Sequence, residues 1–195
     1  MAREHGAELA AKRQRTRALA AAVVEAGAER VAALDLSADA EAALDDAAAV
    51  ACLGRATIER QPHGRRDILS IPIIEETPRI VGQLSLLARG LLAMGLDEPR
   101  AVALARRAAL DTMPQPRRRV LSALATGEPA TTAHVAEAAS MHWNVARLAL
   151  EDLEAVGVCA RHGDRPLTHD DDAPDRRPWR LGHGEGQLIG HVFNA

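Results

Sequence analysis

Apolar side chains recur along most of this chain at intervals of three and four residues, the spacing of one face of a helix. Residues 7–31 predict a first helix that is basic in its early turns and apolar later. Ser37 is a suitable N-cap for a second long helix, and Asp39 and Glu41 match the positive end of its dipole. This helix is expected to fade near residues 61–66, where proline and glycine interrupt the pattern.

The middle of the chain predicts a connector and two further helices. Residues 68–74, ILSIPII, are apolar but contain Pro72, so we expect an extended connector packed on the core and not a central strand. Thr77 before Pro78 predicts the cap and first position of a third helix, which Gly95 should end. Its apolar positions at helical spacing are Ile80, Leu84, Leu87, Leu91 and Met94.

A fourth helix is predicted from Asp97 and Pro99, and a boundary follows it. The residues of this helix available for burial are Val102, Leu104, Ala105, Ala108 and Ala109. Pro114 and Pro116 separate the helical array from the rest of the chain, so we place a domain boundary near Met113.

The pattern changes after Gln115. It predicts a helix with Val120, Leu121 and Leu124 inside, a short helix capped by Thr131 or Thr132 and carrying Val135 and Ala138, and a turn at residues 140–142. A third helix follows over residues 143–156, with Ala146, Leu150 and Leu153 inside, and then two strands near Val158 and Trp179. Gly127 ends the first of these helices and Gly157 ends the third. Three helices followed by two strands make up the winged helix-turn-helix plan. We therefore predict a mainly α protein, with an N-terminal helical bundle (1–113) and a C-terminal winged helix-turn-helix domain (114–195).

Composition agrees with a helical protein that has no membrane segment. Hydrophobic residues make up 47% of the chain and aromatics only 2%, so closely spaced helices packed on alanine are favoured over sheets. Cys52 and Cys159 lie far apart without a partner motif, which predicts free thiols. Without a signal peptide or a long apolar run, the protein is expected to be cytoplasmic.

The segment VARLALEDLEAVGVCARHGD resembles the recognition helix and first wing strand of bacterial winged-helix proteins. TTAHVAEAAS, which precedes it, is similar to their positioning helix, and the resemblance covers about residues 116–182. It implies a protein that binds duplex DNA, in transcriptional regulation, with the N-terminal helices supplying a homodimer contact.

A fainter resemblance concerns TPRIVGQLSLLARGLLAMGLDEPRAVALARRAAL, which is similar to the helical lid of AAA+ ATPases of the minichromosome-maintenance kind. Arg79 would occupy the position of an arginine that senses nucleotide. The chain has no GxxxxGK[ST] phosphate loop, and Lys12 is its one lysine. The alternative function is therefore a protein-interaction module, lid plus winged helix, that acts with an AAA+ ATPase on a separate chain.

The winged-helix hypothesis assigns DNA contacts to donors on the third helix of this domain and around it. Arg147 is the best candidate for guanine or phosphate. Asn144 would read adenine or cap the helix, and Trp143 would rest on sugar or pack under the turn. The predicted DNA-binding residues are Arg117, Arg118, Arg119, Thr132, His142, Trp143, Asn144, Arg147, Arg165, Arg176 and Arg177.

Charge argues against DNA binding, and no pattern indicates an enzyme. Residues 115–195 hold nine arginines and eleven acidic residues, a net charge of −2, whereas DNA-binding modules usually carry a basic face. In the competing hypothesis, the acidic face of Glu151, Asp152 and Glu154 would point at a protein partner. His169 beside Asp170–Asp172 is expected to be a solvated wing tip and not a metal site. No catalytic constellation is apparent, so we expect no enzymatic activity and no cofactor.

Overall fold

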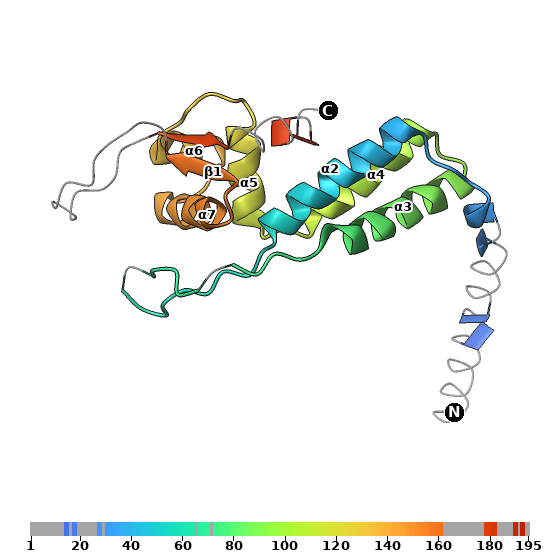
Figure 1. Cartoon of the computed structure of the whole chain (residues 1–195), viewed down its shortest axis with the longest axis horizontal. Coiled ribbons are helices and arrows are strands. Elements are labelled where there is room, and N and C mark those ends of the chain that lie inside the picture. The colour runs from blue at the N-terminus through green and yellow to red at the C-terminus, as the bar shows by residue number, and fades with distance from the viewer. Residues whose placement is uncertain are drawn as a thin grey trace, which may run out of the picture.

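The protein is mainly α-helical, with one small antiparallel sheet near the C-terminus in the part of the chain that is described. The computed structural model describes residues 14–15, 17–18, 27–28, 30–64, 66–70, 72–161, 178–182, 189–190 and 192–193. Its elements (Figure 1) are α2 (Ala38–Gly54), α3 (Thr77–Ala93), α4 (Glu98–Asp111), α5 (Gln115–Leu124), α6 (Thr132–Ala138), α7 (Trp143–Ala155), β1 (Cys159–Arg161) and β2 (Trp179–Leu181). Most of the predicted first helix lies outside the described residues, although residues 14–15, 17–18, 27–28 and 30–32 are helical.

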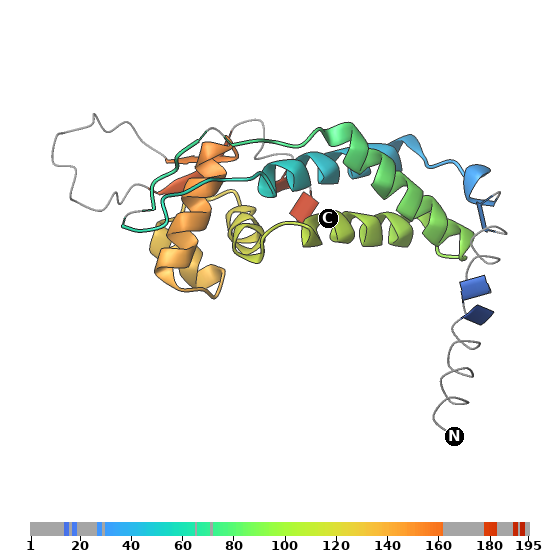
Figure 2. The ribbon, with the colours of Figure 1, turned by 90° about the horizontal axis from the view of Figure 1, so that it is seen from below.

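Helices α2, α3 and α4 lie side by side and enclose a core made largely of alanine (Figures 1 and 2). Ser37 caps α2 by accepting a hydrogen bond from the Ala40 amide, and Asp97 caps α4 by accepting one from Arg100, as predicted. Small side chains let helix axes approach closely, which suits a sequence poor in aromatics. The alanines of this core are Ala40, Ala47, Ala48, Ala51, Ala88, Ala105 and Ala109.

Helix α2 ends earlier than predicted, at Gly54. Thr57 and Ile58 follow, and such β-branched residues favour extended backbone. Gly54 itself lies against Met113, because a Cβ at this position would overlap the methionine sulfur. The chain therefore leaves the helix at the point where α2 meets the start of the C-terminal half.

Residues 56–64, 66–70 and 72–75 form a long hairpin that we call the arm. Bridges join Thr57 to Ile73 and Arg60 to Ile68, and the Leu69 amide donates to the Glu59 carbonyl at 2.9 Å. The prediction that residues 68–74 pack on the core is wrong, because Leu69 is 54% exposed and Ile73 is 77% exposed. The backbone partner of this segment is the outgoing half of the arm, and the alanine core is already enclosed by three helices.

Helices α3 and α4 begin and end close to the predicted points but bury a narrower face. Glu76 is the N-cap of α3, so Thr77 and Pro78 are its first two residues. Ile80 and Leu84 are buried as predicted. The predicted core positions that are instead exposed are Leu87, Met94 and, on α4, Leu104. Alanine supplies much of the buried surface between these helices, so the larger side chains lie outside the contact.

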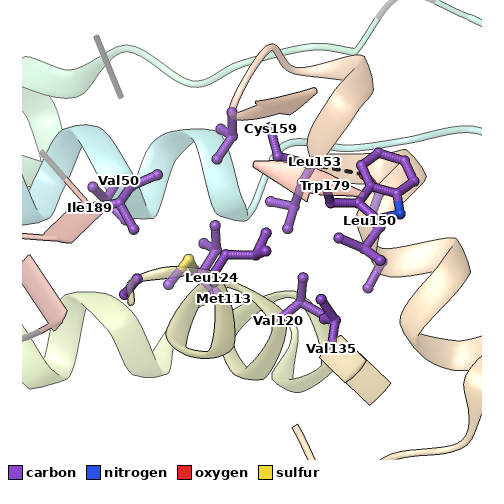
Figure 3. Close-up of a cluster of buried hydrophobic side chains, with 14 of the residues drawn as sticks. Val50, Met113, Val120, Leu124, Val135, Leu150, Leu153, Cys159, Trp179 and Ile189 are labelled. Carbon is purple, nitrogen blue, oxygen red and sulfur yellow. Dashed lines mark hydrogen bonds between the residues drawn. The ribbon is translucent and has the colours of Figure 1, made fainter. Parts of the chain in front are cut away.

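The C-terminal unit, residues 114–161 with 178–182, has the predicted order of three helices and two strands. Strand β1 pairs antiparallel with β2, Cys159 opposite Leu181, and Ala130 forms a further bridge to Trp179. Gly127 and Gly157 follow α5 and α7 with φ of 84° and 80°, the left-handed conformation that favours glycine. In α6, Val135 is buried as predicted, whereas Ala138 is exposed. The core side chains (Figure 3) include Val120, Leu121, Leu124, Val135, Leu150, Leu153 and Trp179.

The two halves of the chain share their second core. Val50 of α2 and Met113 are buried in the same cluster as Leu124 and Trp179 (Figure 3). Ile189 lies beside Val50 in this cluster. The chain near Met113, between α4 and α5, is therefore packed within a core, and α2 contributes buried side chains to both cores.

Candidate nucleic-acid interface

The start of α7 presents consecutive side chains to solvent. A tight turn precedes it, with Ser140 at φ 50°, and His142 is the N-cap. The His142 Nδ1 atom accepts a hydrogen bond from the Asn144 amide at 3.2 Å, so His142 and not Asn144 caps the helix. Trp143 is 41% exposed, so it does not pack under the turn, and Val145 is exposed beside it. The opposite face of α7 is fixed in the core through Ala146 and Leu150.

Arg147 lies one turn further along α7 and is partly exposed. Its guanidinium carbon is 5.9 Å from the centre of the Trp143 ring, within the range of a cation–π contact. Its Nη1 atom lies 2.5 Å from Glu151 Oε1. Arg147 therefore sits between an aromatic ring and a carboxylate, at the border of the exposed end of the helix.

Arg117, predicted to hold phosphate, is a buried structural residue with 8% exposure. Its guanidinium donates to Asp152 Oδ2 at 2.9 Å and to the carbonyls of Gly54 at 3.2 Å and Ala56 at 2.6 Å. These acceptors occupy it within the protein, so the prediction of a phosphate contact is wrong for Arg117. The sequence separation of 63 residues from Gly54 explains why local patterns did not reveal this contact.

The other predicted contact residues fall into three groups. Arg118 forms an ion pair with Asp111, while Arg119 on α5 is half-buried with no ion pair to any described residue. Thr132 accepts a hydrogen bond from Trp179 Nε1 at 2.9 Å, so its hydroxyl supports the sheet. Arg165, Arg176 and Arg177 lie outside the described residues, as do His169 and Asp170–Asp172.

Glu151 and Asp152 are neutralised within the chain by an arginine that sequence reasoning missed. Arg60, on the arm, donates to Asp152 Oδ1 through Nε at 2.8 Å and to Glu151 Oε2 through Nη1 at 3.2 Å. Its Nη2 atom donates to the Leu148 carbonyl at 3.1 Å. Glu151 and Asp152 therefore do not form a free acidic face for a protein partner. Arg60 is 92 residues from Asp152 and follows no motif, so no local signal identifies it.

Two other predicted chemistries can be placed. Arg79, the residue in the lid resemblance, forms an ion pair with Glu75 on the neighbouring end of the arm. Cys52 and Cys159 are both free, as predicted, and the structure places both in the interior. Burial raises the pKa of the Cys159 thiol to about 12, with Glu154 adding to the rise and Arg161 opposing it. The thiol therefore remains protonated at neutral pH.

Within the described ranges, no group of three or more His, Cys, Asp or Glu side chains is placed to hold a metal ion. None of the described helices has the length and apolar character that crossing a bilayer requires. Comparisons of the whole chain with family models, with curated proteins and with solved structures find no match.

Proposed function

We propose that the C-terminal unit is a winged helix-turn-helix domain that binds duplex DNA through the N-terminal end of α7. The observation that carries this proposal is the run of exposed side chains His142, Trp143 and Asn144 at the start of a helix whose other face is fully buried. A helix held in this way presents its N-terminal side chains to the major groove from a backbone that is already ordered. Its N-terminal amides and dipole favour a phosphate nearby.

Each exposed side chain has a suitable role. The Asn144 amide has the donor and acceptor needed to read an adenine edge, and the Trp143 ring offers an apolar face to sugar. Arg147 would exchange Glu151 for a guanine or a phosphate. Glu151 would keep a charged partner after this exchange, because it still accepts a hydrogen bond from Arg60.

The test compares Arg147→Ala with the wild-type chain in fluorescence anisotropy against a pool of duplexes, at two salt concentrations. Arg147→Ala should weaken binding to the preferred duplex by about 1–3 kcal/mol and reduce the difference in affinity between duplexes. Arg100→Ala is the matched control, since Arg100 is an exposed arginine in the first turn of α4. Micromolar or weaker binding without a preferred duplex, unchanged by Arg147→Ala, would contradict DNA binding.

A second candidate, a protein-interaction module, is favoured by the outer face of α3. Leu86, Leu87 and Met94 are exposed together, and large apolar patches mark interaction sites. A groove of about 770 Å³ runs between residues 27–28 and 30–32 on one side and this helix on the other, with Leu86 and Met94 in its wall. The partner would be a second copy of the chain or an ATPase on a separate chain.

Sedimentation equilibrium of the wild-type chain and of Leu87→Arg tests the self-association form of this candidate. A dimer that Leu87→Arg dissociates would identify α3 as the subunit contact. A chain that is monomeric throughout the concentration range would exclude a homodimer and leave only the separate partner.

A further inference from the structure

The arm reaches past α7. In Figure 1 the arm leaves α2 and α3 and passes beside α7, on the side away from β1, and Figure 2 shows the arm crossing this helix. The contacts agree, since Arg60 of the arm donates to three groups of α7 between Leu148 and Asp152, which is a little over one helical turn. A segment from the N-terminal half thus flanks the helix that we propose enters the major groove.

A single guanidinium fixes the tip of the arm to α7. Arg60 Nη1 donates to the Arg66 carbonyl at 2.6 Å and to Glu151 Oε2 at 3.2 Å. Because one nitrogen bonds both groups, the backbone at Arg66 lies within a few ångströms of the Glu151 carboxylate. Asp152 holds the other side of the same guanidinium and also binds Arg117, so the anchor is tied to α5 as well.

The tip carries basic side chains and no acid. Residues 61–66 read QPHGRR, and Asp67 is the first acidic residue after them. His63 and Arg66 are exposed, and Arg66 has φ 60° in the turn. In the described part of the chain, the Arg66 side chain has no hydrogen bond or ion pair, whereas Arg117, Arg118 and Arg147 are all paired with carboxylates.

Phosphate neutralisation supplies much of the affinity of DNA-binding proteins, and carboxylates within the chain already hold Arg117, Arg118 and Arg147 of the C-terminal unit. We infer that the tip of the arm is a second DNA-contacting element, in which Arg66 holds a backbone phosphate beside the groove that α7 occupies. This inference rests on the proposed function of α7. It also adds positive charge from the other half of the chain to residues 115–195, which hold nine arginines and eleven acidic residues.

The test adds three full-length variants to Arg147→Ala. Affinity and salt slope are measured with a fluorescein-labelled duplex of about 20 base pairs and random sequence, long enough for two half-sites, and sequence preference with the pool of duplexes used for Arg147→Ala. Arg66→Asn removes the charge with a residue that tolerates positive φ, and Arg66→Lys keeps the charge. Arg100→Asn removes an exposed arginine from the first turn of α4, away from α7, and is the charge-matched control.

Arg66→Asn should weaken binding about threefold at 0.1–0.2 M salt and lower the slope of log K against log salt by about 0.9, the loss of one phosphate contact. Sequence preference should not change, because phosphate contacts carry no base information. Arg66→Lys should bind close to the wild type, and Arg100→Asn should keep the wild-type slope.

Three outcomes would overturn the inference, and they are distinguishable. If Arg147→Ala weakens binding while Arg66→Asn changes neither affinity nor slope, the arm makes no contact and the proposed function of α7 stands. If Arg66→Asn tightens binding, the arm obstructs DNA. If the wild-type chain does not bind the duplex at all, the inference and the proposed function fail together.

Discussion

The bundle of α2, α3 and α4 buries mostly alanine, whereas the C-terminal unit buries leucine, valine and a fully enclosed tryptophan. In the bundle, each alanine contributes little apolar surface, but the short side chains let the helices approach closely. In the C-terminal unit, Trp179 and the leucines contribute most of the buried volume. The two cores should therefore respond in opposite ways to a change of side-chain volume: the bundle resists enlargement and the C-terminal unit resists truncation.

The largest effect is expected for Trp179→Ala. Trp179 is fully buried and its indole donates to Thr132, so truncation leaves a large cavity and an unpaired hydroxyl. The free energy of unfolding should fall by about 3–5 kcal/mol, measured by urea denaturation. Trp143→Ala is the matched control, because Trp143 is exposed and its loss should cost within about 0.5 kcal/mol. Equal losses for the two tryptophans would contradict the assignment of the core.

The next effect tests the contact between the two regions. Asp152→Ala leaves the guanidinium groups of Arg60 and Arg117 without their shared carboxylate in a site that is mostly buried. Stability should fall by about 3 kcal/mol, because each charge keeps its desolvation cost and loses its partner. Asp111→Ala also removes a carboxylate that faces two arginines, but at the surface, and should cost at most about 1 kcal/mol. If the two substitutions cost the same, the buried cluster does not join the halves.

Enlarging the alanine core should have a smaller effect. Ala105→Leu inserts a larger, branched side chain at a position that is fully buried. Overpacking should lower the free energy of unfolding by about 1–3 kcal/mol. Ala103→Leu, two residues earlier on the exposed side of α4, is the control and should leave stability within about 0.5 kcal/mol. Thermal denaturation followed by circular dichroism measures both. A neutral Ala105→Leu would mean that the bundle core is loosely packed.

The smallest effect is expected from the thiol of Cys159 at alkaline pH. Burial raises its pKa to about 12 from the ordinary value of 9.0, so the folded state binds the proton more tightly than the unfolded state. The stabilisation is therefore complete below pH 9 and is lost as pH rises from 9 towards 12. At pH 10 the loss should be about 1 kcal/mol relative to pH 8.

Cys159→Ala should remove this pH dependence, as seen in urea denaturation at several pH values. Few other side chains of the chain titrate in this range, because it has no tyrosine and Lys12 is its one lysine. An unchanged alkaline slope in Cys159→Ala would show that another group is responsible.

Local sequence signals predicted where the helices begin in both halves of the chain. The caps at Ser37, Asp97 and Thr131 and the glycine stops act within one turn, so their residues identify them directly. The start of α3 was displaced by one residue, because Thr77 and Pro78 are compatible with either register at a helix start. Element order needs only such local information.

The parts that were mispredicted depend on contacts between distant residues. The end of α2 depends on the pairing of Thr57 with Ile73, and the burial of Arg117 depends on carbonyls of α2. The exposure of Leu87 depends on which side of α3 faces alanine. Helical periodicity identifies an apolar face but not how much of it a neighbour covers. The exposed start of α7 was within reach of sequence, whereas the anchoring of the arm by Arg60 was not.

The position of Val50 in the second core has a consequence for how the chain is made. The ribosome synthesises α2 first, and the Gly54 carbonyl has no Arg117 donor until 63 more residues have been added. At about 5–20 residues per second this delay is roughly 3–13 s, during which the end of α2 has neither its apolar cover nor its donor. The second core therefore cannot close until α5 has been synthesised, although its first side chain, Val50, is made before the C-terminal unit begins.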